Sequence, residues 1–264
     1  MAKNSTKKNG KYHGCAFGFY NVHGTDLLVI MFPKIIHYCW FGRNPLPKSA
    51  MRCISSWREF FPDFEIQEWN EDNFDINMTP YTKEAYEAKK YAFVSDFARY
   101  WILFNYGGVY FDTDVEVIKS FSSILKKGAF FGREAGTDGK VAPGLGMAVS
   151  AGHGFYKEVL EYYSGIHFFN EDSSFNQTTI VNYTTDLLMN YGLIREDVFQ
   201  QIDGINIFPS DYFCPMDSTT GIIKKTNNTV SIHHYDCSWL NHYTFRFQIH
   251  LIKNRINRLL GTKF

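Results

Sequence analysis

Residues 92–114 read AFVSDFARYWILFNYGGVYFDTD, and this stretch decides the fold class. Apolar residues fill Ala92 to Tyr106 at the density of a buried helix, and Gly107-Gly108 is a typical signal for the end of a helix. The next residues, Val109-Tyr110-Phe111, predict a short buried strand that leads directly into Asp112-Thr113-Asp114. A helix that feeds a buried strand in this way is typical of an α/β fold.

The alternation of strands and helices continues on both sides of this stretch. Residues 35–40 form a short apolar run, 47–60 have helical spacing, and 64–69 alternate as a strand. These three pieces predict one β-α-β unit, which requires parallel strands. Further strands are expected at 129–132, 145–150, 205–208 and 229–233, and further helices at 153–163, 178–191 and 241–260. We therefore expect an α/β fold in a single domain, with a Rossmann-like sheet flanked by helices.

The composition narrows the class of protein. The chain has 264 residues, of which 45% are hydrophobic and 20% charged, enough for the core of one large domain and too apolar for a disordered chain. The 27 basic and 27 acidic residues balance, so no nucleic acid is expected as a partner. No cysteine pair has C-x-x-C spacing, and the odd, scattered set predicts reduced thiols in a cytoplasmic protein: Cys15, Cys39, Cys53, Cys214 and Cys237.

The two ends of the chain differ from its centre. Residues 1–30 start polar and basic and show no clear signal peptide, so we interpret them as an N-terminal extension before a domain at 31–240. Residues 241–264 predict a basic amphipathic helix, and 245–264 carries five basic residues and no acidic one. This segment either packs on its own domain or contacts the cytoplasmic face of the inner membrane. No apolar run approaches the roughly 20 residues that a membrane-spanning helix needs.

Asp112 and Asp114 lie two residues apart at the end of an apolar strand. In extended backbone such residues point to the same face, and ligands of open α/β sheets gather at the carboxyl ends of strands. Two carboxylates in that place suit Mg²⁺ or Mn²⁺ holding a diphosphate. A bare D-x-D is a weak signal, because two acids at a solvated strand end give the same pattern.

The helix before this pair carries Asp96 and Arg99, which share one helix face because they are three residues apart. An exposed ion pair within the helix would explain them without any function. Their neighbours are too apolar for a solvated face, however. We therefore favour a partly buried pair that binds sugar hydroxyls close to the diphosphate.

With these residues in place, the chain resembles the DXD-containing sugar transferases of glycosyltransferase family 32. Three stretches carry the resemblance in the same order: 33–42 reads PKIIHYCWFG, 91–114 holds the S-D-x-x-R and D-x-D residues, and 233–239 reads HHYDCSW. The family includes bacterial capsular polysaccharide glycosyltransferases and yeast initiating mannosyltransferases, and it is distantly similar to the clostridial glucosylating toxins. The resemblance implies a GT-A fold and transfer, with retention, of a sugar from a nucleotide-diphosphate sugar.

The resemblance also implies roles at the donor. Trp40 matches the residue whose ring stacks on the donor base, with core packing as the alternative. Asp96 and Arg99 match the pair that holds the transferred sugar. Ser238 and Trp239 match a closing lid that contacts the diphosphate and the sugar, although the two are adjacent here and one residue apart in the toxins.

Asp112 and Asp114 match the ligands of the metal and the diphosphate, and Tyr110 lies in the same pocket by the same resemblance. We assign His234 as a third metal ligand, because a neutral imidazole suits Mn²⁺ and the residue follows an expected strand. An ordinary hydrogen-bonded histidine is the alternative. His233 would point to the opposite face if the strand continues. The catalytic group is then expected to be Asp96, Arg99, Asp112 and Asp114.

The sequence therefore predicts a retaining, metal-dependent glycosyltransferase. It would move a hexose from a nucleotide-diphosphate sugar, preferably a UDP-sugar, to a saccharide or lipid-linked saccharide acceptor in capsular or surface polysaccharide synthesis. Loops 133–146 and 165–184 are expected to distinguish the sugars. Two alternatives remain: a catalytically silent nucleotide-sugar-binding protein, and a phosphatase with its nucleophile in a D-x-D. The phosphatase motif usually has Thr or Val two residues after its second Asp, whereas this chain has Glu116.

Overall fold

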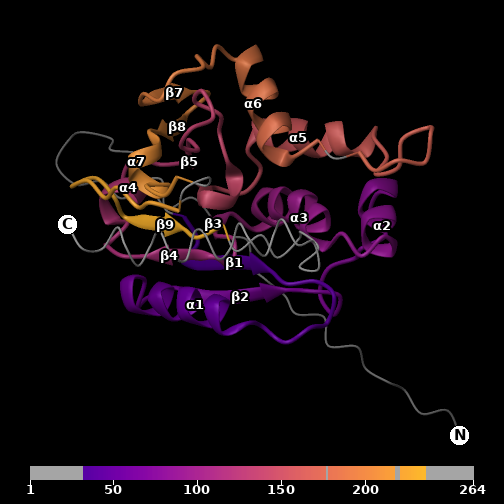
Figure 1. Cartoon of the computed structure of the whole chain (residues 1–264), viewed down its shortest axis with the longest axis horizontal. Helices are drawn as coiled ribbons and strands as arrows, with labels where there is room; N and C mark the ends of the chain where they lie inside the picture. The colour runs from indigo at the N-terminus through magenta and orange to yellow at the C-terminus, as the bar shows by residue number, and fades with distance from the viewer. Residues whose placement is uncertain (1–31, 177, 218–220, 236–264) are drawn as a thin grey trace, which may run out of the picture.

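A computed structural model gives the structure of the protein for residues 32–176, 178–217 and 221–235 (Figure 1). The expected N-terminal extension at 1–30 and the expected C-terminal helix at 241–264 lie outside these described residues. The same is true of Ser238 and Trp239.

Within the described residues, a mixed sheet of seven strands forms the centre of the fold, in the order β2-β1-β3-β6-β5-β8-β7. β1 pairs in parallel with both β2 and β3, β3 and β5 each pair antiparallel to β6, and β8 pairs in parallel with β5 and antiparallel to β7. The strand bounds are Ile35–Cys39 (β1), Glu65–Trp69 (β2), Gly108–Tyr110 (β3), Phe130–Gly132 (β5), Met147–Val149 (β6), Gln200–Ile202 (β7) and Ile205–Phe208 (β8). The expected parallel β-α-β unit is confirmed.

Helices flank this sheet, as the α/β prediction requires (Figure 1). They are Lys48–Phe60 (α1), Pro80–Glu87 (α2), Tyr91–Tyr106 (α3), Ser122–Leu125 (α4), Gly154–Ser164 (α5), Ile180–Asn190 (α6) and Ser210–Phe213 (α7), with a 3-10 turn at Pro143–Leu145. A separate two-stranded sheet pairs β4 (Val115–Val117) antiparallel to β9 (Ser231–His233). The expected α/β class is therefore confirmed, as a mixed sheet with flanking helices. β4, β7, α4 and α7 were not expected from the sequence.

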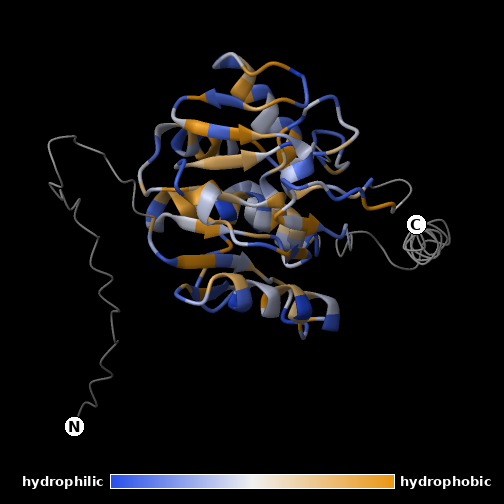
Figure 2. Cartoon of the chain, turned by 90° about the vertical axis from the view of Figure 1, so that its left-hand side faces the viewer, coloured by the Kyte–Doolittle hydropathy of each residue, from blue (hydrophilic) through white to orange (hydrophobic). Residues whose placement is uncertain are grey.

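Alternation along the strands divides the apolar residues between two cores, one on each face of the sheet. On β3, for example, Val109 packs with Trp57 of α1, whereas Tyr110 packs with the residues of α2, α3 and α5. β5 divides in the same way, with Phe130 in the first core and Phe131 in the second. Figure 2 shows hydrophobic residues concentrated in the strands, as expected for a sheet covered on both faces. None of the helices described is long and apolar enough to cross a membrane.

The junction between α3 and β3 depends on glycine. Gly107 ends α3 with φ 65°, and Gly108 follows with φ 99°, a backbone region that favours glycine. A Cβ on Gly108 would lie 2.7 Å from the carbonyl oxygen of Ile35 in the neighbouring strand. The two glycines thus let the chain turn from a buried helix directly into a central strand, which fixes where Asp112 and Asp114 emerge.

Candidate active site

A cavity of about 520 Å³ opens where β3 ends, a size typical of sites for small-molecule ligands. Its walls include the end of β1, the start of α1, the first half of α3, the D-x-D turn, the segment 134–145, the start of α6 and the end of β9. Five of the predicted site residues line it, namely Trp40, Asp96, Arg99, Asp112 and Asp114. The structure therefore brings together residues that lie up to 74 positions apart.

The D-x-D residues occupy a turn between β3 and β4, not a continuous strand. The backbone N–H of Val115 donates to the carbonyl of Asp112 at 3.1 Å, and the N–H of Asp112 donates to the carbonyl of Gly144 at 3.2 Å. The phenol of Tyr110 donates to Oδ1 of Asp112 at 3.0 Å. Tyr110 thus holds the carboxylate of Asp112 by a hydrogen bond. It does not itself line the cavity, contrary to the expectation that it lies in the same pocket.

Arg99 links Asp96 to the D-x-D turn. Its side chain is 5% exposed, and its Nη2 lies 2.9 Å from Oδ1 of Asp96 and 3.3 Å from Oδ1 of Asp112. Nη1 donates to Oδ2 of Asp112 at 3.3 Å, and the guanidinium lies 5.1 Å from the ring centre of Tyr110. The buried guanidinium therefore holds the carboxylates of Asp96 and Asp112 together in one charged network.

Burial dominates the electrostatics of these groups. It raises the pKa of Asp96 to about 6, against the opposing effects of Arg99 and of a hydrogen bond from the backbone N–H of Ile180. Burial also raises the pKa of Asp112, where Arg99 again opposes it and the charge of Asp114 adds to it. Two carboxylates that repel each other in a buried place are stabilised by a bound cation.

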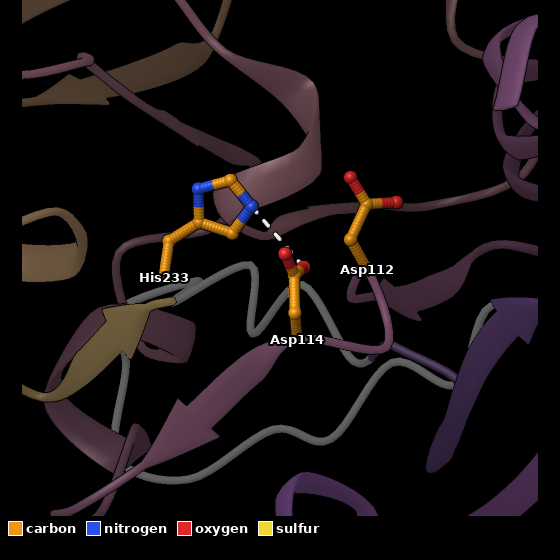
Figure 3. A group of neighbouring side chains, drawn as sticks. All are labelled: Asp112, Asp114 and His233. Carbon is orange, nitrogen blue, oxygen red and sulfur yellow. Dashed lines mark ion pairs between the residues drawn. The ribbon is translucent and has the colours of Figure 1, made fainter. Parts of the chain in front are cut away.

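His233, and not His234, completes the cluster. One ligand atom each from Asp112, Asp114 and His233 lie within 4.8 Å of one another, and Figure 3 shows the three side chains turned toward a common space. His233 Nε2 lies 3.1 Å from Oδ1 of Asp114. His234 Nε2 lies 2.8 Å from Oε2 of Glu116 instead. The structure therefore places His233, and not the expected His234, beside Asp112 and Asp114.

The physical reason is strand register. β9 pairs antiparallel to β4 with His233 opposite Val115, next to Asp114, and consecutive residues on a strand point to opposite faces. The sequence offers His234 as a candidate beside the D-x-D residues, but only the pairing of β9 with β4 shows that His233 lies there. Burial lowers the pKa of His233, but the nearby carboxylate of Asp114 outweighs this and raises it to about 9.

The donor set fits a divalent cation. Two carboxylate oxygens and one imidazole nitrogen suit Mn²⁺, and the carboxylates also suit Mg²⁺. Three protein ligands leave positions of a six-coordinate ion open for the oxygens of a diphosphate. The cluster can thus hold a metal and a phosphorylated ligand together.

The loops 133–146 and 165–184, which were expected to distinguish the sugars, supply further cavity residues that no motif singles out. Glu134, Lys140 and Asn182 line the cavity from two segments that are not adjacent in the chain. Tyr235 also lines it; its ring lies 4.2 Å from that of His233, and its phenol donates to Glu134 Oε1 at 3.1 Å. All of these side chains depend on long-range packing, which a local pattern does not encode.

A known family model matches the part of the chain that carries most of this site. Residues 47–131, which include Asp96, Arg99, Asp112 and Asp114, match the family model described as "Glycosyltransferase sugar-binding region containing DXD motif". The resemblance inferred from the sequence is therefore confirmed for the segment that contains the D-x-D turn.

Curated relatives of this DXD region include mannosyltransferases. Inositol phosphoceramide mannosyltransferase 3 of Schizosaccharomyces pombe is 29% identical over 134 residues, which cover 48% of this chain and 36% of that protein. An uncharacterised glycosyltransferase of Acanthamoeba polyphaga mimivirus is 35% identical over 107 residues, 38% of this chain and 43% of that protein. The chain thus spans less than half the length of these relatives.

Two solved structures that are similar to this chain are those of glycosyltransferases. The PaToxG glycosyltransferase has a TM-score of 0.48 at 18% identity, and the match covers 60% of this chain and 69% of the PaToxG chain. The galactosyltransferase LgtC, in complex with donor and acceptor sugar analogs, has a TM-score of 0.30 at 16% identity, and covers 82% of this chain and 94% of its own.

Proposed function

We propose that the chain is a retaining, metal-dependent glycosyltransferase. It would move a hexose from a nucleotide-diphosphate sugar, preferably a UDP-sugar, to a saccharide or lipid-linked saccharide acceptor. One observation supports this most: Asp112, Asp114 and His233 converge in a cavity beside the buried Arg99–Asp96 pair, within a DXD sugar-binding region. The cavity thus offers a place for a metal, a diphosphate and a sugar side by side.

Asp112, Asp114 and His233 would hold Mn²⁺ or Mg²⁺, which when bound neutralises the charge that develops on the departing diphosphate. Arg99 contributes a second, permanent positive charge, because its guanidinium contacts Asp112 and stays protonated when buried. The cation and Arg99 together would favour departure of the nucleotide diphosphate.

The transferred sugar would bind beside Asp96. Its carboxylate is held by Arg99 and by the N–H of Ile180, so it has a fixed orientation from which to accept hydrogen bonds from sugar hydroxyls. Trp40 lines the cavity at the end of β1, where its half-buried ring could stack on the nucleotide base.

The chemical step would exchange one bond at the anomeric carbon for another on the same face of the sugar. The bond to the diphosphate oxygen breaks, the acceptor oxygen forms the new bond, and the acceptor proton passes to the departing phosphate. No protein nucleophile is needed, so Asp96 positions the sugar and does not attack its anomeric carbon. A donor sugar with an α linkage would therefore give an α-linked product.

The biological setting is proposed from the resemblance to capsular polysaccharide glycosyltransferases: synthesis of a capsular or surface polysaccharide in the cytoplasm or at the cytoplasmic face of the inner membrane. The basic segment 245–264, a candidate for membrane contact, lies outside the described residues. Binding to anionic liposomes, compared between the full chain and a chain that ends at residue 244, tests this part.

A donor screen tests the enzymatic proposal. The purified protein is incubated with UDP- and GDP-sugars and Mn²⁺, and release of the nucleoside diphosphate is measured. We expect release from one donor, loss of release on removal of metal, and loss in Asp112→Asn and Asp114→Asn. Asp63→Asn is the matched control, because Asp63 is exposed and pairs only with Lys34 among the described residues. Metal-dependent UDP binding without turnover of any donor would favour a silent nucleotide-sugar-binding protein.

A further inference from the structure

One wall of the cavity is a β-hairpin with two charged side chains on its inner face. Arg133 pairs with Val141, and the N–H of Glu134 donates to the carbonyl of Lys140 at 2.9 Å. Because neighbouring residues alternate between the faces of a strand, Arg133 and Val141 are completely buried on one side. Glu134 and Lys140 are half-buried and line the cavity on the other side.

Glu134 lies beside Lys140 on this face, but its carboxylate accepts a hydrogen bond from Tyr235 and forms no ion pair with Lys140. The Nζ of Lys140 donates to the neutral amide oxygen Oδ1 of Asn182 at 2.8 Å, and among the described residues no ion pair includes Lys140. An ammonium group has three N–H donors and is stabilised by an anion when it is partly removed from water. Lys140 is therefore positioned to bind an anion that enters the cavity.

The same helix connects Lys140 to the place proposed for the sugar. The N–H of Ile180, the first residue of α6, donates to the carboxylate of Asp96, and Asn182 lies two residues later on the same turn. Lys89 adds a second positive charge to the lining of the cavity and is exposed. The metal cluster at Asp112 is the place for the diphosphate, so the Lys140 wall is open to another part of the substrates.

We propose that Lys140, held by Asn182, binds a carboxylate or phosphate group on one of the sugar substrates. This inference rests on the proposed function, because it assumes that sugars enter this cavity. The anionic group belongs either to the transferred sugar, as in a uronic acid, or to the acceptor, as in a phosphorylated or acidic sugar. In both cases the neutral sugar of the same shape binds more weakly.

Isothermal titration calorimetry with matched neutral and anionic ligands tests the proposal. The acceptor arm compares methyl glucoside with methyl glucuronide and with glucose 6-phosphate, in the presence of Mn²⁺ and UDP. The donor arm compares UDP-glucose with UDP-glucuronic acid in the presence of Mn²⁺. In the wild-type protein we expect the anionic member of one arm to bind at least tenfold more tightly than its neutral partner.

Variants assign this preference to Lys140. Lys140→Gln keeps a donor for Asn182 but removes the charge, and we expect the preference to fall to near onefold. Lys140→Arg should retain it. Lys157→Gln is the matched control, because Lys157 is an exposed lysine on α5 and does not line the cavity. Melting temperatures show whether each variant is folded. If Lys140→Gln is not folded, the wild-type protein and Lys140→Arg still test the proposal.

Each outcome has a separate meaning. A preference in the acceptor arm assigns the anion to the acceptor, and a preference in the donor arm assigns it to the transferred sugar. No preference in either arm of the wild-type protein, or a preference that survives in Lys140→Gln, overturns the proposal. The proposal is also overturned if Lys140→Gln weakens the binding of UDP as much as that of the anionic sugar, because Lys140 would then bind the diphosphate. Failure of the wild-type protein to bind UDP with Mn²⁺ would instead contradict the proposed function.

Discussion

Gly144 gives the sharpest test of how the D-x-D residues are held. A Cβ added to Gly144 would lie 2.1 Å from Oδ2 of Asp112 and 3.3 Å from Nη1 of Arg99. The carboxylate would have to move by about 1.3 Å to reach ordinary van der Waals contact at 3.4 Å. Metal sites tolerate displacements of only a few tenths of an ångström, so Gly144→Ala should remove Asp112 as a ligand.

The expected result is loss of metal binding in a folded protein. Gly144 has no positive φ, and the clashing atom is the end of a side chain, so the backbone accepts alanine without strain. We expect the dissociation constant of Mn²⁺ to rise at least tenfold, about 1.4 kcal/mol, with a melting temperature within about 2 °C of the wild type. Electron paramagnetic resonance of free Mn²⁺ measures the first quantity, and circular dichroism the second.

A matched control and a clear contradiction complete this test. Gly154→Ala changes a glycine at the first position of α5 where an added Cβ meets no atom within 4 Å, so it should bind Mn²⁺ like the wild type. If Gly144→Ala also binds Mn²⁺ and turns over donor like the wild type, the Asp112 carboxylate does not act from the position seen here.

Three further predictions concern Arg99, Tyr235 and His37. Arg99→Lys keeps the charge but cannot contact Asp96 and Asp112 at once, so donor turnover should fall on the order of 100-fold in a nucleoside diphosphate release assay. Tyr235→Phe removes the hydrogen bond that holds the ring of Tyr235 against His233, so Mn²⁺ binding measured by paramagnetic resonance should weaken on the order of tenfold. Unchanged binding would show that the Tyr235 phenol does not help to position His233. Burial lowers the pKa of His37 from 6.5 to about 4, so the unfolded chain binds this proton first as the pH falls. Stability should decrease by up to about 3 kcal/mol between pH 7 and pH 4, and His37→Gln should flatten this part of the urea-unfolding profile; an identical pH profile would contradict the neutral, buried state of His37.

Local patterns predict the fold well where residues act through neighbours in the sequence. The apolar helix before Gly107 and the run from Ile35 to Cys39 have the expected form, because helix periodicity, glycine stops and apolar strands are local properties. β4 and β7 were not expected, because their sequences, Val-Glu-Val and Gln-Gln-Ile, are not apolar runs and each strand depends on its partner.

Some site residues follow from the local sequence, and others depend on long-range contacts. Asp96, Arg99, Asp112 and Asp114 lie within one continuous stretch, and the structure brings them to one cavity. The choice between His233 and His234 needed the register of β9 against β4, which is a long-range property. Lys140 and Asn182 have no motif around them, since their contact joins a hairpin to a helix 42 residues away.

The position of a bound metal tests the central claim most directly. Crystals grown with Mn²⁺ and UDP, and measured at an X-ray energy where manganese scatters anomalously, would locate the ion and the diphosphate in one map. The account predicts a manganese peak coordinated by Asp112, Asp114 and His233, with the diphosphate of UDP completing its ligands beside Arg99. A diphosphate bound elsewhere, or a metal that does not contact Asp112 and Asp114, would contradict it.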